Sequence, residues 1–193
     1  DPKLFNKVSI KNLAKILQSN LTPIYANLFT ELKKGNYKVN KKEDQFYCLK
    51  DSVTGKSYKK KLKDLILYLR KKNLDCMLVT SSENIGWLLN IRGNDSNYSP
   101  IPHSYFFVDT NMNFFLFCDL DKVNNFLKKK LGSIKILNIN LIGNFLEKIK
   151  SKNFLIDKLT CSIFYENIIR KNNKIKQFND PIYYAKSIKN KTE

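Results

Sequence analysis

Apolar residues along this chain alternate between helical and extended spacing. Near the start, apolar residues at positions 10, 13, 14 and 17 have the spacing of an amphipathic helix. The same helical spacing recurs in four later segments, at 62–69, 123–127, 141–149 and 163–168. Short apolar runs typical of strands lie between them, at 76–80, 105–108, 114–118, 134–139 and 153–156.

Helices that alternate with short apolar strands predict an α/β sandwich. The runs at 105–108 and 114–118 flank a polar turn, so they predict a β-hairpin. Because a hairpin interrupts the strand–helix–strand alternation, we expect a mixed sheet flanked by helices. The clear domain begins near Ser57, a candidate N-cap, and follows a short predicted helix at 27–33 and a polar predicted linker at 34–50.

The scarcest residue types of the chain concentrate in one segment, at 82–105. It contains the only tryptophan (Trp87), the only histidine (His103) and one of three arginines (Arg92). Its first part, Ile85–Ile91, is apolar and predicted to be helical, and a polar turn leads from it to the strand that starts near residue 104. Scarce residues on one loop beside a strand are typical of a functional edge of an α/β domain.

Two interpretations of the polar turn after Arg92 are open. In the first, the turn is a binding site: Gly93 permits an unusual backbone angle, and Arg92 offers a planar fork to a carboxylate. Alternatively, Asn94 and Asp95 hold the turn with their own hydrogen bonds. Trp87, which lies among apolar residues at helical spacing, is interpreted as a core anchor.

The chain offers little other chemistry. The run at 54–57 contains Gly-Lys-Ser but lacks the first glycine and the preceding strand of a phosphate-binding loop, so we interpret it as a turn before a helix. Asp119, Asp121 and Asp157 lie near strand ends, where capping and turn formation explain them better than metal binding. His103 has no partners of the kind that triads and hydrolytic metal sites need. We therefore predict no catalytic and no metal-binding residue in this chain.

Charge and cysteines limit the environment. The net charge of +18 comes almost wholly from lysines mixed with many asparagines, whereas proteins that read nucleic-acid sequence favour arginine, so we predict no specific nucleic-acid partner. The four cysteines lack CxxC spacing, and Cys76 and Cys118 lie in apolar runs, so we expect buried free thiols and a cytoplasmic location. No apolar run approaches the ~20 residues of a membrane span.

Twelve residues between 80 and 105 follow one another in the order of a known family motif: Thr80, Glu83, Ile85, Trp87, Leu88, Asn90, Arg92, Gly93, Asp95, Pro100, Ser104 and Tyr105. On these residues the segment resembles the middle domain of cytosolic-type aminopeptidase P, the Xaa-Pro aminopeptidase of the creatinase/prolidase superfamily. We regard four of them as a structural signature, namely Trp87, Asn90, Gly93 and Ser104. A looser likeness extends over nearly the whole chain.

The resemblance implies a creatinase N-terminal-like α/β sandwich. Residues 1–50 would be the end of a first creatinase-like domain plus linker, and residues 51–193 the middle domain. The full-length enzyme would remove the N-terminal residue from peptides with a penultimate proline. It would use two divalent metal ions, expected to be manganese, held by a catalytic domain outside this chain, and would form a homodimer. This chain would then bind no cofactor, and its partners would be its own catalytic domain and the peptide substrate.

The resemblance also suggests a role for the middle domain, as one wall of the catalytic cleft that limits access to short peptides. Five residues are candidates for the face turned toward that cleft: Arg92, Asn94, Asp95, His103 and Tyr105. The alternative is a catalytically inactive creatinase-like binding module of the histone-chaperone type, which would recognise protein or polyanion partners. The Trp-Leu-x-Asn-x-Arg-Gly-x-Asp phrase favours the peptidase.

Overall fold

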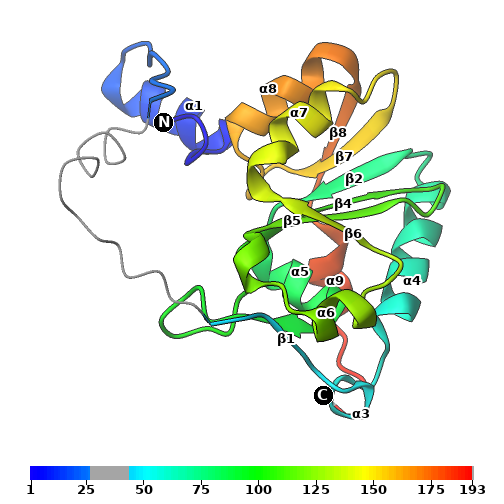
Figure 1. Ribbon diagram of the computed structural model, residues 1–193. Coiled ribbons are helices and arrows are strands. Elements are labelled where there is room, and N and C mark those ends of the chain that lie inside the picture. The colour runs from blue at the N-terminus through cyan, green and yellow to red at the C-terminus, as the bar shows by residue number, and fades with distance from the viewer. Residues whose placement is uncertain (27–43, 193) are drawn as a thin grey trace.

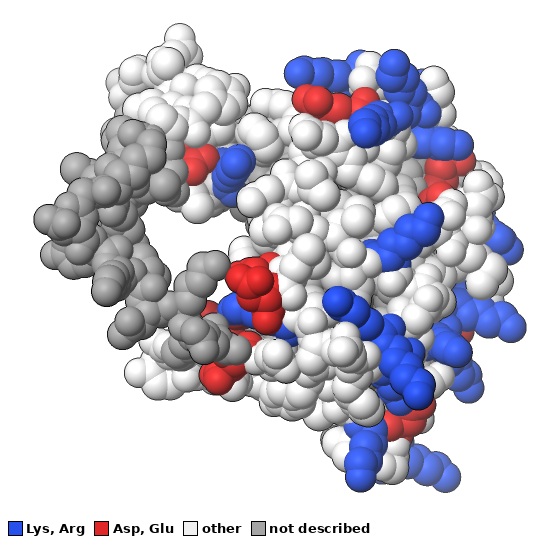
Figure 2. All heavy atoms as spheres, viewed as in Figure 1, with Lys and Arg blue, Asp and Glu red and all other residues white. Residues whose placement is uncertain are grey.

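The computed structural model describes residues 1–26 and 44–192 (Figure 1). The predicted helix at 27–33 and most of the predicted linker at 34–50 lie outside the described residues. Within the described part, no helix is both long enough and apolar enough to cross a bilayer. Figure 2 shows Lys and Arg side chains scattered over the visible face with Asp and Glu side chains among them, as the lysine-rich composition leads us to expect.

A six-stranded sheet forms the centre of the molecule, in the spatial order β6-β5-β4-β2-β7-β8. Its strands are β2 (Cys76–Val79), β4 (Ser104–Asp109), β5 (Phe114–Cys118), β6 (Lys135–Asn138), β7 (Asn153–Asp157) and β8 (Lys174–Phe178). β4 runs antiparallel to both of its neighbours, and the other neighbouring pairs are parallel. The predicted hairpin and the predicted mixed sheet are confirmed.

Helices cover both faces of this sheet (Figure 1). One face packs against α4 (Tyr58–Lys71), α5 (Ser82–Leu89), α6 (Asn125–Lys130) and α9 (Pro181–Ser187), and the other against α7 (Ile142–Glu147) and α8 (Ile163–Asn172). The other helical elements within the described residues are α1 (Lys7–Leu17), α3 (Asp51–Thr54) and two short 3₁₀ turns, Leu120–Lys122 and Ile139–Leu141. The α/β sandwich predicted from the sequence is confirmed.

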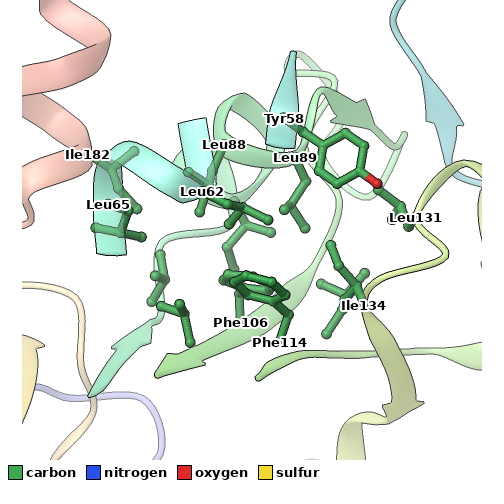
Figure 3. Close-up of a cluster of buried hydrophobic side chains, with 14 of the residues drawn as sticks. Tyr58, Leu62, Leu65, Leu88, Leu89, Phe106, Phe114, Leu131, Ile134 and Ile182 are labelled. Atoms are coloured by element: carbon green, nitrogen blue, oxygen red, sulfur yellow. The ribbon is translucent and has the colours of Figure 1, made fainter. Parts of the chain in front are cut away.

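Two apolar cores lie on opposite faces of the sheet because side chains alternate along each strand. In β4, Phe106 and Val108 belong to the core under α4 and α5, whereas Phe107 belongs to the core under α7 and α8. Figure 3 shows Leu62 of α4 and Leu88 of α5 in the first core, above Phe106. A sheet covered on both faces explains why its central strands are continuous apolar runs rather than alternating ones.

Local capping signals fix the helix ends that the sequence predicts. The Ser57 side chain accepts a hydrogen bond from the Lys60 amide (3.4 Å), so the predicted N-cap of α4 is confirmed. The predicted helix at 85–91 is wrong at its end. Asn90 adopts a left-handed conformation (φ 56°) that ends α5, and Ile91 lies in the short strand β3 (Ile91–Arg92).

The apolar pattern does not predict β8 or α9. β8 is an edge strand in which four of five residues are exposed, so its sequence shows no buried run, and only its parallel pairing with β7 makes it a strand. α9 starts with Pro181 in its first turn and is capped by Asp180, whose side chain accepts from the Ile182 amide (2.8 Å). The Asp-Pro pair was the available signal.

Residues of the predicted linker contribute to the main core. Strand β1 (Tyr47–Cys48) pairs antiparallel with β3 as a separate small sheet. Phe46 is fully buried, and its amide donates to the Lys122 carbonyl (2.8 Å). A Cβ atom at Gly93 would lie 2.7 Å from the Phe46 ring, so the glycine makes room for that ring. The domain division at residue 50 stays a prediction, and the main core of the sheet includes Phe46, which precedes that boundary.

Replacing Phe46 tests this packing. Phe46→Ala should lower the free energy of unfolding by about 3 to 5 kcal/mol, because it leaves a cavity beneath Gly93. Tyr47→Ala is the matched control, since the neighbouring Tyr47 side chain is 45% exposed. Urea denaturation of both variants measures the difference. If the free energy of unfolding falls by the same small amount in both variants, the segment is only a linker.

Candidate functional site

The segment at 82–105 lies at one edge of the sheet. Because β4 is antiparallel to its neighbours, its first residues lie beside the carboxyl ends of β2 and β5, where Ser104 pairs with Cys118 and Phe106 with Val79. The loop at 93–103 therefore lies at the edge where open α/β sheets commonly bind ligands.

A buried lysine organises the helical part of this segment. Lys61 of α4 is only 3% exposed. Its ammonium donates to the Trp87 carbonyl (2.8 Å) and to Asn90 Oδ1 (2.7 Å), and lies 3.9 Å from the centre of the Trp87 ring. A charge is stable in an apolar core only when such groups replace its water. Trp87 itself is partly buried against the main core, as the core-anchor interpretation predicts.

Asn90 connects Lys61 to the turn at 54–57. Its amide Nδ2 donates to Thr54 Oγ1 (3.0 Å) and to the Lys56 carbonyl (2.9 Å). Gly55, at φ 65°, ends α3 there, so this run is a turn between two helices, as predicted. One asparagine side chain thus joins α4, α5 and the turn.

The same region holds the C-terminal segment in place. Asn190 donates to the Thr54 carbonyl (3.0 Å). Lys186 forms an ion pair with Glu83. Asn84 donates to Asp180 Oδ2 (2.7 Å) at the start of α9. These contacts fix α9 and the residues that follow it against α5.

Arg92 is anchored to the backbone at the end of α5. Its Nη1 donates to the carbonyls of Gly86 (2.8 Å) and Ile91 (2.9 Å). The side chain is half-buried, and this burial lowers the pKa of its guanidinium. Together with Trp87 and Lys186 it lines a hollow of about 560 Å³.

Asp95 holds the turn, as the second interpretation predicts, whereas Asn94 bonds to a residue outside the turn. Asp95 accepts from the His103 amide and forms an ion pair with Lys122. Asn94 donates to Asp44 (3.2 Å). Asp95 and the exposed His103 line another hollow of about 580 Å³, on the side of β5 and β6.

Tyr105 packs between His103 of the loop and Tyr165 of α8. Its ring lies 5.1 Å from that of Tyr165 and 6.1 Å from that of His103, in edge-on arrangements. Burial raises the pKa of the Tyr105 hydroxyl. The structure thus places Arg92 at one hollow and Asp95 with His103 at another, and that these residues face a substrate stays a prediction.

Gly93 and Ser104 have structural roles. Ser104 is fully buried and its hydroxyl donates to the Pro102 carbonyl (2.9 Å), and Gly93 makes room for a buried ring as described above. Sequence reasoning missed Lys61 and Asp180. The available signal for Lys61 was its place between Tyr58 and Leu65 on the apolar face of α4.

The carboxylates near strand ends make local hydrogen bonds. Asp119 accepts from the Asp121 amide (3.2 Å), and Asp157 accepts from the Leu159 amide (3.2 Å) and the Thr160 hydroxyl (2.9 Å). These are the caps and turns that we predicted. Within residues 1–26 and 44–192, no group of three or more His, Cys, Asp or Glu side chains is placed to hold a metal ion.

Asn90 can be tested by two replacements. Asn90→Ala should lower the free energy of unfolding by about 3 kcal/mol, because it removes an acceptor from a buried ammonium and forces alanine into a left-handed conformation. Asn90→Gly loses the same hydrogen bonds without that backbone cost, so it should be more stable than the alanine variant by about 1 kcal/mol. Denaturant titration measures both. Two variants as stable as the wild type would contradict this role.

Asp180 makes stability depend on pH. Burial raises its pKa to about 6, above the unfolded value of about 3.9. The folded state then binds the proton more tightly, so this contribution to stability is full below about pH 4 and is lost as the pH rises through about 6. Between about pH 4 and pH 6, the free energy of unfolding of the wild type should fall by up to about 3 kcal/mol relative to that of Asp180→Asn.

Urea denaturation across this pH range measures that loss. Asp51→Asn is the control, because Asp51 is exposed. A pH-independent difference between the wild type and Asp180→Asn would contradict the assignment.

Curated relatives of this chain are Xaa-Pro aminopeptidases. The chain is 35% identical over 91 residues to Xaa-Pro aminopeptidase 1 of Dictyostelium discoideum, covering 47% of the chain and 14% of that protein. It is 30% identical over 140 residues to a probable Xaa-Pro aminopeptidase P of Fusarium vanettenii, covering 70% of the chain and 22% of that protein. The matched part is therefore a small share of the length of these relatives.

A solved structure has the same fold. It is the X-prolyl aminopeptidase from Caenorhabditis elegans, described as a cytosolic enzyme with a di-nuclear active site. The TM-score is 0.85 at 22% identity, over all of this chain and 32% of that chain. This similarity confirms the creatinase N-terminal-like fold.

The family match covers most of the chain. The model of the Creatinase/Prolidase N-terminal domain matches residues 38–193. That range contains every strand of the six-stranded sheet and the whole segment at 82–105. The chain therefore belongs to the creatinase/prolidase N-terminal domain family.

Proposed function

We propose that this chain is a non-catalytic part of a metal-dependent Xaa-Pro aminopeptidase, which removes the N-terminal residue from peptides with a penultimate proline. The observation that carries the proposal is the match to proteins named Xaa-Pro aminopeptidases, of which the chain spans only 14% to 22%. Those names favour a peptidase over a binding module of the histone-chaperone type. Residues 1–50 and 51–193 would be the end of a first domain with its linker and the middle domain.

In this proposal the catalytic metal ions belong to another domain of the longer protein. The Caenorhabditis elegans enzyme is described as having a di-nuclear active site, which supports two metal ions in the longer protein. We expect divalent ions, with manganese as the candidate. A cytoplasmic location and a homodimer of the full-length enzyme are further parts of the proposal.

The role of this domain would be to form one wall of the catalytic cleft and to admit only short peptides. A wall that selects by size must keep its shape when a peptide enters. Three features support this role for the edge that carries the loop at 93–103. Arg92 is bonded to two backbone carbonyls, Asp95 is paired with Lys122, and Gly93 packs directly on a buried ring.

Replacing Arg92 in the full-length enzyme tests the cleft role. Arg92→Ala should lower kcat/KM for an Xaa-Pro peptide by about tenfold or more. The free energy of unfolding should fall by only about 1 to 2 kcal/mol, for the lost hydrogen bonds to Gly86 and Ile91. Tyr98→Ala is the control, since Tyr98 lies on the same loop and is 98% exposed. Unchanged kcat/KM in Arg92→Ala would sink the proposal that this edge faces the substrate.

A further inference from the structure

The hollow beside Arg92 has an unusual combination of walls. It lies between α5, the loop at 99–102 and the end of α9 with the residues that follow it, and has a volume of about 560 Å³. Trp87, Pro100 and Pro102 give it apolar surfaces. α5 approaches the loop closely, because a Cβ atom on Gly86 would lie only 3.2 Å from the Pro102 ring. The glycine thus sets the distance between two of the walls.

The charged side chains around this hollow are mostly positive. Among the described residues, three cations line it, namely Arg92, Lys186 and Lys189, against one carboxylate, Glu83. Glu83 already forms an ion pair with Lys186. The positive charges of Arg92 and Lys189 are therefore not neutralised by any carboxylate in the described part of the lining. A hollow with this imbalance and partly apolar walls attracts small anions that also carry an apolar group.

Arg92 is fixed in position and still has donors to offer. Its Nη1 is held by two backbone carbonyls, at 2.8 and 2.9 Å. Within the part of the chain that the structure describes, no hydrogen bond occupies its Nε or Nη2 groups. A guanidinium held at one nitrogen keeps little rotational freedom to lose, and its remaining N–H groups match the geometry of a carboxylate.

We propose that this hollow binds the α-carboxylate of a short peptide, with Arg92 as the main contact and Lys189 as a supporting charge. The last residue of the peptide would lie against the Trp87 ring and the two prolines of the loop. The choice of a peptide rests on the proposed function, whereas the choice of a carboxylate rests on the charges of the hollow itself. This site would make the domain select peptides by their free C-terminus as well as by their size.

Trp87 provides the assay, because it is the only tryptophan and lines the hollow. We expect N-acetyl-alanyl-proline to change the tryptophan fluorescence of the 193-residue chain in a saturable way. N-acetyl-alanyl-prolinamide, which lacks only the carboxylate charge, should bind at least about tenfold more weakly, a difference of ~1.4 kcal/mol. Binding of the acid should also weaken as salt is added.

Two variants test whether the change in tryptophan fluorescence comes from binding in the hollow. Arg92→Lys keeps a charge but loses the fork, and should weaken binding of the acid by about tenfold, to the level of the amide. Lys189→Gln changes an exposed side chain that donates to the Lys186 carbonyl (3.2 Å), so it should fold normally and weaken binding by a few-fold. Lys135→Gln, a lysine outside the hollow, is the matched control and should bind like the wild type. Far-UV circular dichroism checks that each variant is folded.

Several outcomes would overturn the proposal. These are equal binding of acid and amide, an effect of sodium acetate equal to that of the peptide, and unchanged binding in both Arg92→Lys and Lys189→Gln. If Arg92→Lys does not fold, the comparison of acid binding between Lys189→Gln and Lys135→Gln decides whether the hollow is the site. The test is independent of the full-length enzyme. Binding that fails here while Arg92→Ala still impairs the full-length enzyme removes this site alone, and binding that succeeds while kcat/KM is unchanged removes the cleft role alone.

Discussion

The buried ammonium of Lys61 is the constraint on which the rest of this domain depends. A charge that is only 3% exposed must find acceptors within the protein, because removing an ion from water costs several kcal/mol even after the protein relaxes. The acceptors are the Trp87 carbonyl and Asn90 Oδ1, with the Trp87 ring beside them. α4 therefore fixes where α5 must end.

The end of α5 in turn places the candidate site. Asn90 turns the chain through a left-handed conformation into β3, which brings Arg92 back to the carbonyl of Gly86. The same asparagine holds the turn at Thr54, and Asn190 is bonded to that turn from the C-terminal segment. One polar network thus determines both the wall of the hollow and the path by which the chain leaves the domain.

This arrangement gives the residues of the family motif structural roles. Trp87, Asn90, Gly93 and Ser104 are all occupied in packing or in hydrogen bonds to the backbone and to Lys61. Such contacts hold the edge of the sheet rigid. The edge itself carries a positively charged side chain, Arg92, and the hollow beside it.

The sequence by itself determined the elements whose signals are local. Apolar periodicity predicted the central strands and the helices of both layers except α9, Ser57 marked a helix start, and the motif at 80–105 indicated the family. Only the tertiary structure showed that Lys61 is buried, that 174–178 pairs as a strand, and that Arg92 and His103 line different hollows. The physical reason is that periodicity reports which face of an element is apolar, whereas the burial of a charge or the pairing of an edge strand depends on partners distant in the sequence.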